Sequence, residues 1–353
     1  MINIIIKGDN PKRKHQYVIF LTLVLILQSA LRNLAVGADT YAYYLKFIDV
    51  QNESWNSIFK EMYNTYILNE GKDTGFKLLE KVFSSFIPSF RVFLFFVAIC
   101  FFVPFCKLAE RTLNNTSQLF LFFCIYQAIF YDFFSVTGLR QTVATVALLL
   151  GIKFIEENKL LRFLIIVLIA SFIHKSVLLI IPFYFVAKLP NSKFLLLASL
   201  LVVPFIIPRA REMAELLAEA SASDQYMYYI DNSYETKGAV YFLLYLIGGA
   251  VLITFAKWKN RTSVPDIFVT ACALGLLFAP LTWVDPTLMR VGQYYSLLSL
   301  IAIPLAIDSF AEGKVLRNLI YCFFVLVIVA IIFKHNADYT FFWNEMQLGD
   351  NYR

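Results

Sequence analysis

Charge is scarce in this chain of 353 residues, of which only 16% are Asp, Glu, Lys or Arg. Soluble globular domains usually carry about 25% charged residues and about 45–50% apolar residues. Here 59% of the residues are hydrophobic and 17% are aromatic, and the mean hydropathy is +0.66. This composition excludes a water-soluble domain and indicates an integral membrane protein. The formal net charge of +6 is therefore no nucleic-acid signal, and we expect no nucleic-acid partner.

The sequence also lacks the short motifs of several enzyme and transporter classes. It contains no GxxxxGK[ST] phosphate loop, no GxSxG elbow, no HExxH zinc motif and no Asp-rich metal motif. The five cysteines lie in or at the ends of apolar runs, without metal-ligand spacing: Cys100, Cys106, Cys124, Cys272 and Cys322. These absences disfavour ATP-driven transport and metallohydrolase chemistry. We predict neither a metal nor another cofactor.

Long apolar runs dominate the rest of the chain. A helix of about 20 residues crosses the roughly 30 Å hydrocarbon core of a membrane. On that basis we predict an all-α, polytopic transmembrane helix bundle that forms a single integral membrane domain over residues 1–353. About eleven spans run near 17–35, 90–107, 118–136, 140–155, 162–174, 176–188, 193–208, 239–257, 264–283, 287–307 and 315–333. The first run has no small-residue cleavage site, so we expect it to be retained as a helix.

Basic residues predict the orientation of the bundle, because Lys and Arg concentrate in cytoplasmic loops. The residues before the first run include four cations: Lys7, Lys12, Arg13 and Lys14. We therefore predict that the N-terminus is inside the cell. With this orientation, Arg140, His174 and Arg290 lie at the outer ends of their spans.

Two segments on the predicted outer side are long, residues 37–90 and 209–238. In the first, apolar residues recur with helical spacing in two stripes: Trp55, Ile58, Phe59, Met62, Tyr63, Tyr66 and Ile67, then Phe76, Leu79, Phe83 and Phe86. This spacing predicts two amphipathic helices. We expect both helices to lie in the interface plane and to cover the outer face of the bundle. The second segment has a weaker stripe and is predicted to form a second cover.

Arg140 and His174 stand at the ends of two apolar runs. A helical hairpin separates them, so the chain returns both residues to the same side of the membrane. An ionisable group beside hydrocarbon normally faces the bundle interior or a water-filled cavity. A guanidinium matches phosphate oxygens bidentately, and an imidazole can take a proton from a hydroxyl. The pair predicts a site for an anionic, phosphate-bearing substrate, with Lys175 at the tip of the hairpin. The alternatives are an arginine that snorkels to the interface and a histidine bonded to backbone.

A third cation, Arg290, shares a predicted helix face with Tyr294. Its partner is either a substrate phosphate or one of two carboxylates, Asp285 or Asp132. Asp285 and the following proline are predicted to open the tenth span, with Asp285 as its N-cap or as a residue of the site.

Acidic residues follow the first span, which carries Arg32 near its end. Gly37 can turn the chain back toward the bundle, so Asp39 faces a cavity mouth as a base or as a ligand for sugar hydroxyls. The alternative is that Asp39 caps a helix over residues 40–48. Glu70 and Asp73 raise the same two alternatives before the second amphipathic helix.

These pieces occur in an order that resembles one known family. They are Gly37-Ala38-Asp39-Thr40 with Tyr43, Glu70 to Phe76, Leu139-Arg140-Gln141, Ser171 to Ser176, and Met289 to Tyr295. The chain resembles the EpsG family, the Wzy-like membrane proteins linked to polymerisation of bacterial exopolysaccharides and O-antigens. Each piece is short, but together they extend over most of the chain. Segment 209–237 contains no motif of the family.

The resemblance implies a glycosyltransferase of the bacterial cytoplasmic membrane that joins undecaprenyl-diphosphate-linked repeat units on the outer face. For such a reaction we predict catalysis by Arg140, His174, Arg290 and Asp39, and substrate binding by Arg32, Tyr43, Glu70, Lys175, Asp285 and Tyr294. The expected partners are the lipid-linked oligosaccharides and membrane lipid, and a chain-length-regulating co-polymerase is an open alternative. Rival functions are a flippase for a lipid-linked glycan and an O-antigen ligase-type transferase.

Overall fold

The computed structural model describes residues 10–37, 39–68, 70–71, 73–220, 230, 239–259, 264–285, 288–309, 314–335 and 339–346. These residues form helices joined by short turns, and they contain no β-strand. An isolated antiparallel bridge joins Arg32 and Phe341. The prediction of an all-α fold is confirmed.

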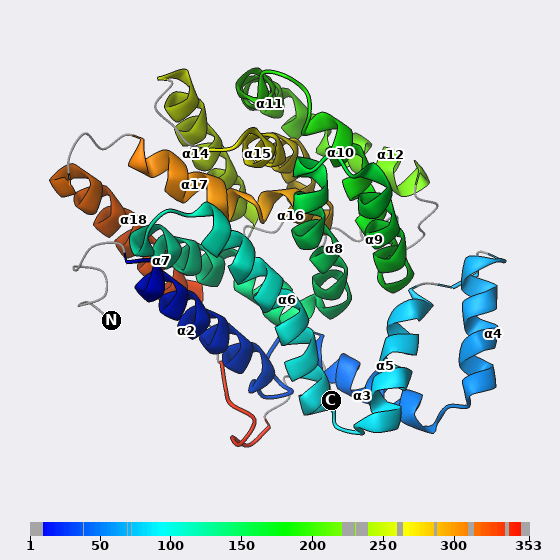
Figure 1. Cartoon of the computed structure of the whole chain (residues 1–353). Helices are drawn as coiled ribbons and strands as arrows, with labels where there is room; N and C mark the ends of the chain where they lie inside the picture. The colour runs from blue at the N-terminus through cyan, green and yellow to red at the C-terminus, as the bar shows by residue number, and fades with distance from the viewer. Residues whose placement is uncertain are drawn as a thin grey trace. The chain divides into compact units, whose positions relative to one another are not determined.

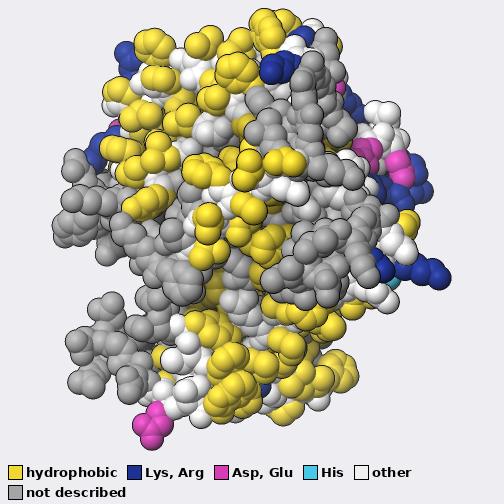
Figure 2. All heavy atoms as spheres, turned by 90° about the vertical axis from the view of Figure 1, so that its left-hand side faces the viewer, with side chains coloured by type: hydrophobic (Ala, Val, Ile, Leu, Met, Phe, Trp, Pro, Cys, Tyr) yellow, Lys and Arg dark blue, Asp and Glu magenta, His cyan; other side chains and the backbone are white. Residues whose placement is uncertain are grey.

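Four of the described helices are long and apolar enough to cross a membrane: Phe90–Thr112, Ser192–Glu219, Val240–Trp258 and Asp266–Trp283. A fifth span exists if Met289–Ser296 and Ser299–Asp308, which are bent by 46°, count as one. Hydrophobic side chains cover much of the face drawn in Figure 2, as expected for helices in contact with lipid. Among all described residues, exposed large hydrophobic side chains include Phe20, Leu161 and Ile169. The chain is a membrane protein.

The count of eleven spans and the inside location of the N-terminus stay predictions. Several predicted spans form shorter pieces. The run near 118–136 consists of α7 (Thr116–Ile125) and two π-helical segments, Tyr126–Phe130 and Asp132–Thr137. The run near 176–188 consists of a 3₁₀ helix, Lys175–Ile180, and the short α10, Ile181–Val186. A count of apolar residues does not detect these breaks.

The chain divides into two compact units. The first unit comprises residues 1–178 and 326–353. Its helices are α2 (Pro11–Ala30), α3 (Thr40–Asn52), α4 (Trp55–Tyr66), α5 (Thr74–Phe86), α6 (Phe90–Thr112), α7, α8 (Leu139–Glu156) and α9 (Leu160–Ile173). Helix α2 packs on α6, α6 packs on α8, and α8 packs on α9 (Figure 1).

The second unit comprises residues 179–325. It contains α10, α11 (Ser192–Ile206), α12 (Ala210–Ala220), α14 (Ala239–Trp258), α15 (Asp266–Phe278), α16 (Met289–Ser296) and α17 (Ser299–Asp308), and α18 (Lys314–His335) continues from it into the first unit. Helix α15 packs against α11 and α16, and α14 packs against α17. Of the predicted cover 209–238, the part after α12 lies outside the described residues, except for Ile230.

The two predicted amphipathic helices are present as α4 and α5. Ser54 caps α4, because its side chain accepts a hydrogen bond from the backbone N–H of Ser57 at 3.2 Å. Helix α5 buries Phe76 in an aromatic cluster with Tyr43 and Phe93, and packs against α3, α4 and α9. This packing fixes the start of α5 against the end of α9.

Gly75, in the first turn of α5, permits that close approach. A Cβ added to Gly75 would lie 2.1 Å from the carbonyl oxygen of Phe172, the penultimate residue of α9. Tyr66 joins the same two backbone segments. Its hydroxyl donates to the Phe172 carbonyl and accepts a hydrogen bond from the backbone N–H of Gly75 at 3.0 Å. A side chain at position 75 would force two backbones apart.

We predict that Gly75→Ala lowers the free energy of unfolding by about 1–3 kcal/mol, the usual cost of overpacking. The matched control is Gly248→Ala in α14, where an added Cβ has no atom within 4 Å. Thermal unfolding of both purified variants in detergent measures the difference. Equal melting temperatures for the two variants would show that α5 and α9 are not held together at this point.

Candidate functional site

A buried carboxylate, Asp73, lies at the centre of a polar cluster in the first unit. Its side chain is 0% exposed, and one oxygen, Oδ2, contacts both an imidazole and a guanidinium. His174 Nδ1 lies 2.8 Å from this oxygen, and Arg140 Nη1 lies 3.2 Å from it. The second oxygen, Oδ1, accepts the backbone N–H of Lys175 at 3.2 Å. The structure therefore brings Arg140 and His174 to the same carboxylate.

Asp73 occupies the position before the first residue of α5, with a left-handed backbone, φ +50° and ψ +36°. This conformation is uncommon outside glycine, and Asp and Asn tolerate it better than most residues. Asp73 makes no side-chain capping bond to α5. Its carboxylate instead crosses to the end of α9, so the helix-capping alternative does not hold for Asp73.

His174 ends α9, with an extended backbone that leads into the 3₁₀ helix Lys175–Ile180. Its side chain is 10% exposed. An ionised carboxylate only accepts hydrogen bonds. Nδ1 of His174 therefore carries a proton, and the Nδ1–H donates a hydrogen bond to Asp73. In the neutral imidazole, Nε2 then holds the lone pair. This is the arrangement in which a carboxylate orients a histidine that acts as a base.

Arg140 is in the first turn of α8. The preceding π-helical segment ends at Thr137, and Gly138 separates it from α8. The boundary predicted between the spans near 118–136 and 140–155 is therefore present. The Nε of Arg140 donates to the hydroxyl of Tyr43 at 3.4 Å, in addition to the bond from Nη1 to Asp73. Arg140 is thus bound by two protein groups, a phenol and a carboxylate. A guanidinium has five N–H donors, and these two contacts use two of them.

The electrostatics of the cluster favour an ionised Asp73. Burial alone raises the pKa of this carboxyl. The hydrogen bond from His174, the positive charges of His174 and Arg140, and the backbone N–H of Lys175 lower it further than burial raises it, so the pKa lies below its ordinary value of 3.8. Asp73 is therefore a fixed negative charge at neutral pH. It holds the imidazole of His174 and the guanidinium of Arg140 in place.

A second carboxyl on α5 behaves in the opposite way. Glu80 is 3% exposed, and burial raises its pKa to about 8, against the weaker opposing charges of Lys46, Arg140 and Lys77. Glu80 is therefore mainly protonated at neutral pH. The sequence did not single out this residue.

Two other predicted residues lie close to this cluster. Asp39 precedes the first residue of α3, as the capping alternative predicts, but its side chain makes no capping bond. Its charge acts on Arg140. Tyr43 is 8% exposed and holds Arg140 through its hydroxyl, while its ring packs on Phe76. Gly37 makes the turn before α3 at φ +82°, with no room for a Cβ beside Val136.

Lys175 contributes its backbone N–H to the cluster. The predicted role, binding of substrate through its side chain, stays a prediction. Glu70 is exposed, and its described contact is a backbone bond to Asn64. Arg32 is 1% exposed and donates to neutral oxygens, among them Thr40 Oγ1 at 3.2 Å and the Val136 carbonyl at 3.3 Å.

The remaining predicted residues belong to the second unit. Arg290 is half-buried on α16. Tyr294 is 0% exposed, so its ring packs inside the unit, which disfavours the predicted contact with substrate. Capping of the tenth span by Asp285 stays a prediction, because residues 286 and 287 lie outside the described residues and the described α16 begins at Met289 with Leu288 at its N-cap. The backbone carbonyl of Asp285 accepts the N–H of Leu288 at 3.0 Å in the preceding turn.

Among the described residues, no group of three or more His, Cys, Asp and Glu side chains is arranged to hold a metal ion. The cluster around Asp73 is instead a carboxylate with an imidazole and a guanidinium. Such a set can transfer a proton through His174 and attract an anion through Arg140.

The helices define a membrane protein in which a carboxylate, an imidazole and a guanidinium meet where α5, α8 and α9 come together. A family model for the EpsG family matches residues 15–347, nearly the whole chain. The chain therefore belongs to the EpsG family, and the resemblance drawn from its motifs is confirmed. Searches of curated proteins and of solved structures found no match.

We predict that Asp73→Asn lowers the free energy of unfolding at pH 7 by roughly 3–5 kcal/mol, because it removes one partner of a buried ion pair. Asn tolerates the left-handed backbone, so the change isolates the charge. The pKa of Asp73 is below 3.8 in the folded protein, so the stabilisation is full above about pH 5 and is lost as pH falls below about 4.

Melting temperatures of wild type and Asp73→Asn between pH 3 and 8, both titrated in about one-unit steps, measure this dependence. The control is Asp49→Asn on the exposed face of α3, for which we expect no pH-dependent difference. A gap between wild type and Asp73→Asn that stays unchanged down to pH 3 would contradict the ion pair.

Glu80→Gln should have the opposite dependence. The folded pKa of Glu80, about 8, exceeds its ordinary value of 4.5, so the wild type loses stability as pH rises between these values. Gln imitates the protonated acid and removes that loss. We expect the melting temperature of Glu80→Gln to exceed that of wild type, by a margin that grows from pH 5 to pH 8. Glu212→Gln, at an exposed position of α12, is the control, and equal curves for Glu80→Gln and wild type would contradict the raised pKa.

Proposed function

We propose that this protein is an exopolysaccharide polymerase that joins undecaprenyl-diphosphate-linked repeat units on the outer face of the bacterial cytoplasmic membrane. Membership of the EpsG family supports the polymerase-type function. The observation that carries the proposal is the shared carboxylate of Asp73, which sets an imidazole beside a guanidinium. Transfer from a lipid diphosphate requires both a proton acceptor and a charge that favours an anion.

The reaction has one bond-forming and one bond-breaking event. A hydroxyl of the acceptor repeat unit attacks the anomeric carbon of the donor chain, and a new glycosidic C–O bond forms. The bond between that carbon and the diphosphate oxygen breaks, and undecaprenyl diphosphate leaves with the electron pair. The proton of the attacking hydroxyl passes to a base. The diphosphate is already a good leaving group, so charge neutralisation is the main assistance that it requires.

His174 is the proposed base. The Asp73 carboxylate holds the Nδ1–H of the ring, which leaves Nε2 to accept the proton of the hydroxyl and stabilises the imidazolium that forms. Arg140 is the proposed partner of the diphosphate, through N–H groups that Tyr43 and Asp73 do not use. Asp73 is a positioning residue, because it acts through both. We propose that Asp39 is not the base. Its negative charge instead stabilises the positive charge of the Arg140 guanidinium.

Substitution of either proposed catalytic residue should stop polymerisation at the first step. We expect His174→Ala to lower the rate of chain extension by about 10²–10⁴, the usual contribution of a general base. Cells that depend on this protein should then accumulate single repeat units attached to lipid, and Arg140→Ala should give the same lesion. Gel analysis of lipid-linked glycans measures chain length.

His15→Ala and Arg111→Ala are matched controls, because both residues form surface ion pairs away from the cluster, with Glu110 and Glu156. Wild-type chain lengths in His174→Ala would remove this residue from the mechanism. Glycans that fail to reach the outer face would indicate a flippase. Long chains that stay unattached would indicate a ligase.

The role of Asp73 needs a separate readout. In a reaction with purified protein and a defined lipid-linked oligosaccharide, run with and without a chelator, Asp73→Asn should shift the pH profile of the rate as well as its maximum. A purely structural role would lower the amount of folded protein and leave the profile unchanged.

A further inference from the structure

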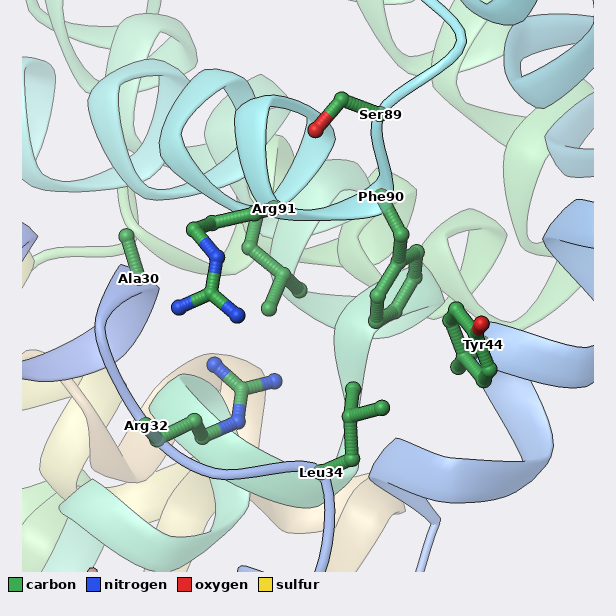
Figure 3. Close-up of a pocket in the computed structure, with 8 residues that line it drawn as sticks. Ala30, Arg32, Leu34, Tyr44, Ser89, Phe90 and Arg91 are labelled. Carbon is green, nitrogen blue, oxygen red and sulfur yellow. The ribbon is translucent and has the colours of Figure 1, made fainter. Parts of the chain in front are cut away.

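A second cationic cluster in the first unit is separate from Asp73. A cavity of about 200 Å³ is lined by Ala30, Arg32, Leu34, Tyr44, Ser89, Phe90, Arg91 and Leu94. Figure 3 shows the guanidinium groups of Arg32 and Arg91 pointing toward one another across this cavity. Water occupies about 30 Å³ per molecule in the liquid, so the space is large enough for a group of several heavy atoms.

Neither guanidinium has an acidic partner among the described residues. Arg32 is 1% exposed, and the acceptors of its hydrogen bonds are neutral oxygens of Ser29, Thr40 and Val136. Arg91 stacks on the ring of Phe342 at 3.4 Å, and its Nη1 is buried with no hydrogen-bond partner. A buried donor without a partner is costly, and two like charges that face one another repel.

The other lining groups complete an amphiphilic site. Arg91 is in the first turn of α6, and Ser89 precedes this helix without capping it, so the backbone N–H groups at this helix end add to the attraction for an anion. Leu34, Phe90 and Leu94 supply an apolar wall. An anionic head between the two guanidiniums, followed by an apolar chain along this wall, would satisfy both parts of the site.

We infer that the Arg32–Arg91 cavity binds the phosphate-bearing headgroup of an isoprenoid lipid. That the occupant is the diphosphate of a lipid-linked substrate rests on the proposed function, whereas the anion site itself does not. Planar guanidiniums bind phosphate oxygens bidentately, and a diphosphate offers oxygens to both. The cavity then holds one lipid-linked substrate at a place distinct from the Asp73 cluster.

The test measures binding by the purified full chain in neutral detergent. The probes are farnesyl diphosphate, inorganic pyrophosphate, and nanodiscs with phosphatidylglycerol or with phosphatidylcholine alone. Wild type should bind farnesyl diphosphate at least tenfold more tightly than pyrophosphate, because the apolar wall adds to the affinity. Arg91→Gln should weaken binding of farnesyl diphosphate by about tenfold or more, the effect of one lost charge-assisted hydrogen bond.

Arg111→Gln is the matched control, because Arg111 lies at the other end of α6 and pairs with Glu156. It should bind farnesyl diphosphate as wild type does. Arg32→Lys and Arg91→Lys retain charge without the bidentate fork, so we expect partial recovery relative to the Gln variants. Because Arg32 is buried, the melting temperature of each variant is recorded, and Arg91→Gln carries the conclusion if Arg32→Gln does not fold.

Unchanged binding of farnesyl diphosphate in Arg91→Gln would overturn the inference. Binding of phosphatidylglycerol that equals that of farnesyl diphosphate and depends on Arg91 would overturn the assignment to isoprenoid substrates. His174→Ala should bind farnesyl diphosphate normally. If His174→Ala also makes normal polymer while Arg91→Gln loses binding, the proposed catalytic role fails and the anion site stands.

Discussion

The arrangement of the candidate site depends on one buried negative charge. Asp73 is fully enclosed, and a carboxylate in such a place is tolerated only with paired charges and hydrogen bonds. His174, Arg140 and the N–H of Lys175 supply them. Each of these donors is itself costly to bury without an acceptor, and the Asp73 carboxylate is the acceptor that all three share. Asp73 thereby holds together the start of α5, the start of α8 and the C-terminal end of α9.

Part of this site could be predicted from the sequence. Arg140 and His174 stand at the ends of apolar runs joined by a hairpin, and helix geometry returns such ends to the same side. Asp73 could not be selected in the same way, because its contact with His174 joins residues 101 positions apart. That contact depends on the approach of Gly75 to Phe172, and a glycine in a sequence does not identify the backbone that it meets.

The fold has the same division between what the sequence predicts and what it does not. The helical class and both amphipathic helices follow from composition and spacing, because apolar residues recur at the helical period. The number of spans does not follow, because apolar runs look continuous where the chain changes to π or 3₁₀ turns, as at Asp132–Thr137. The pairing of Arg32 with Arg91 could not be predicted from the sequence either. Arg91 stands at the start of a helix, as many interfacial arginines do, so nothing in the sequence distinguished it.

The last described residues of the chain pair with the turn after the first helix. The backbone N–H of Asn33 donates to Thr340 at 2.8 Å, and that of Phe342 donates to Leu31 at 3.0 Å, which sets the Phe342 ring against Arg91. Arg91 thus takes its stacking partner from a segment that is distant in the sequence. Any change that detaches this segment from the turn after α2 would leave the guanidinium without its aromatic contact.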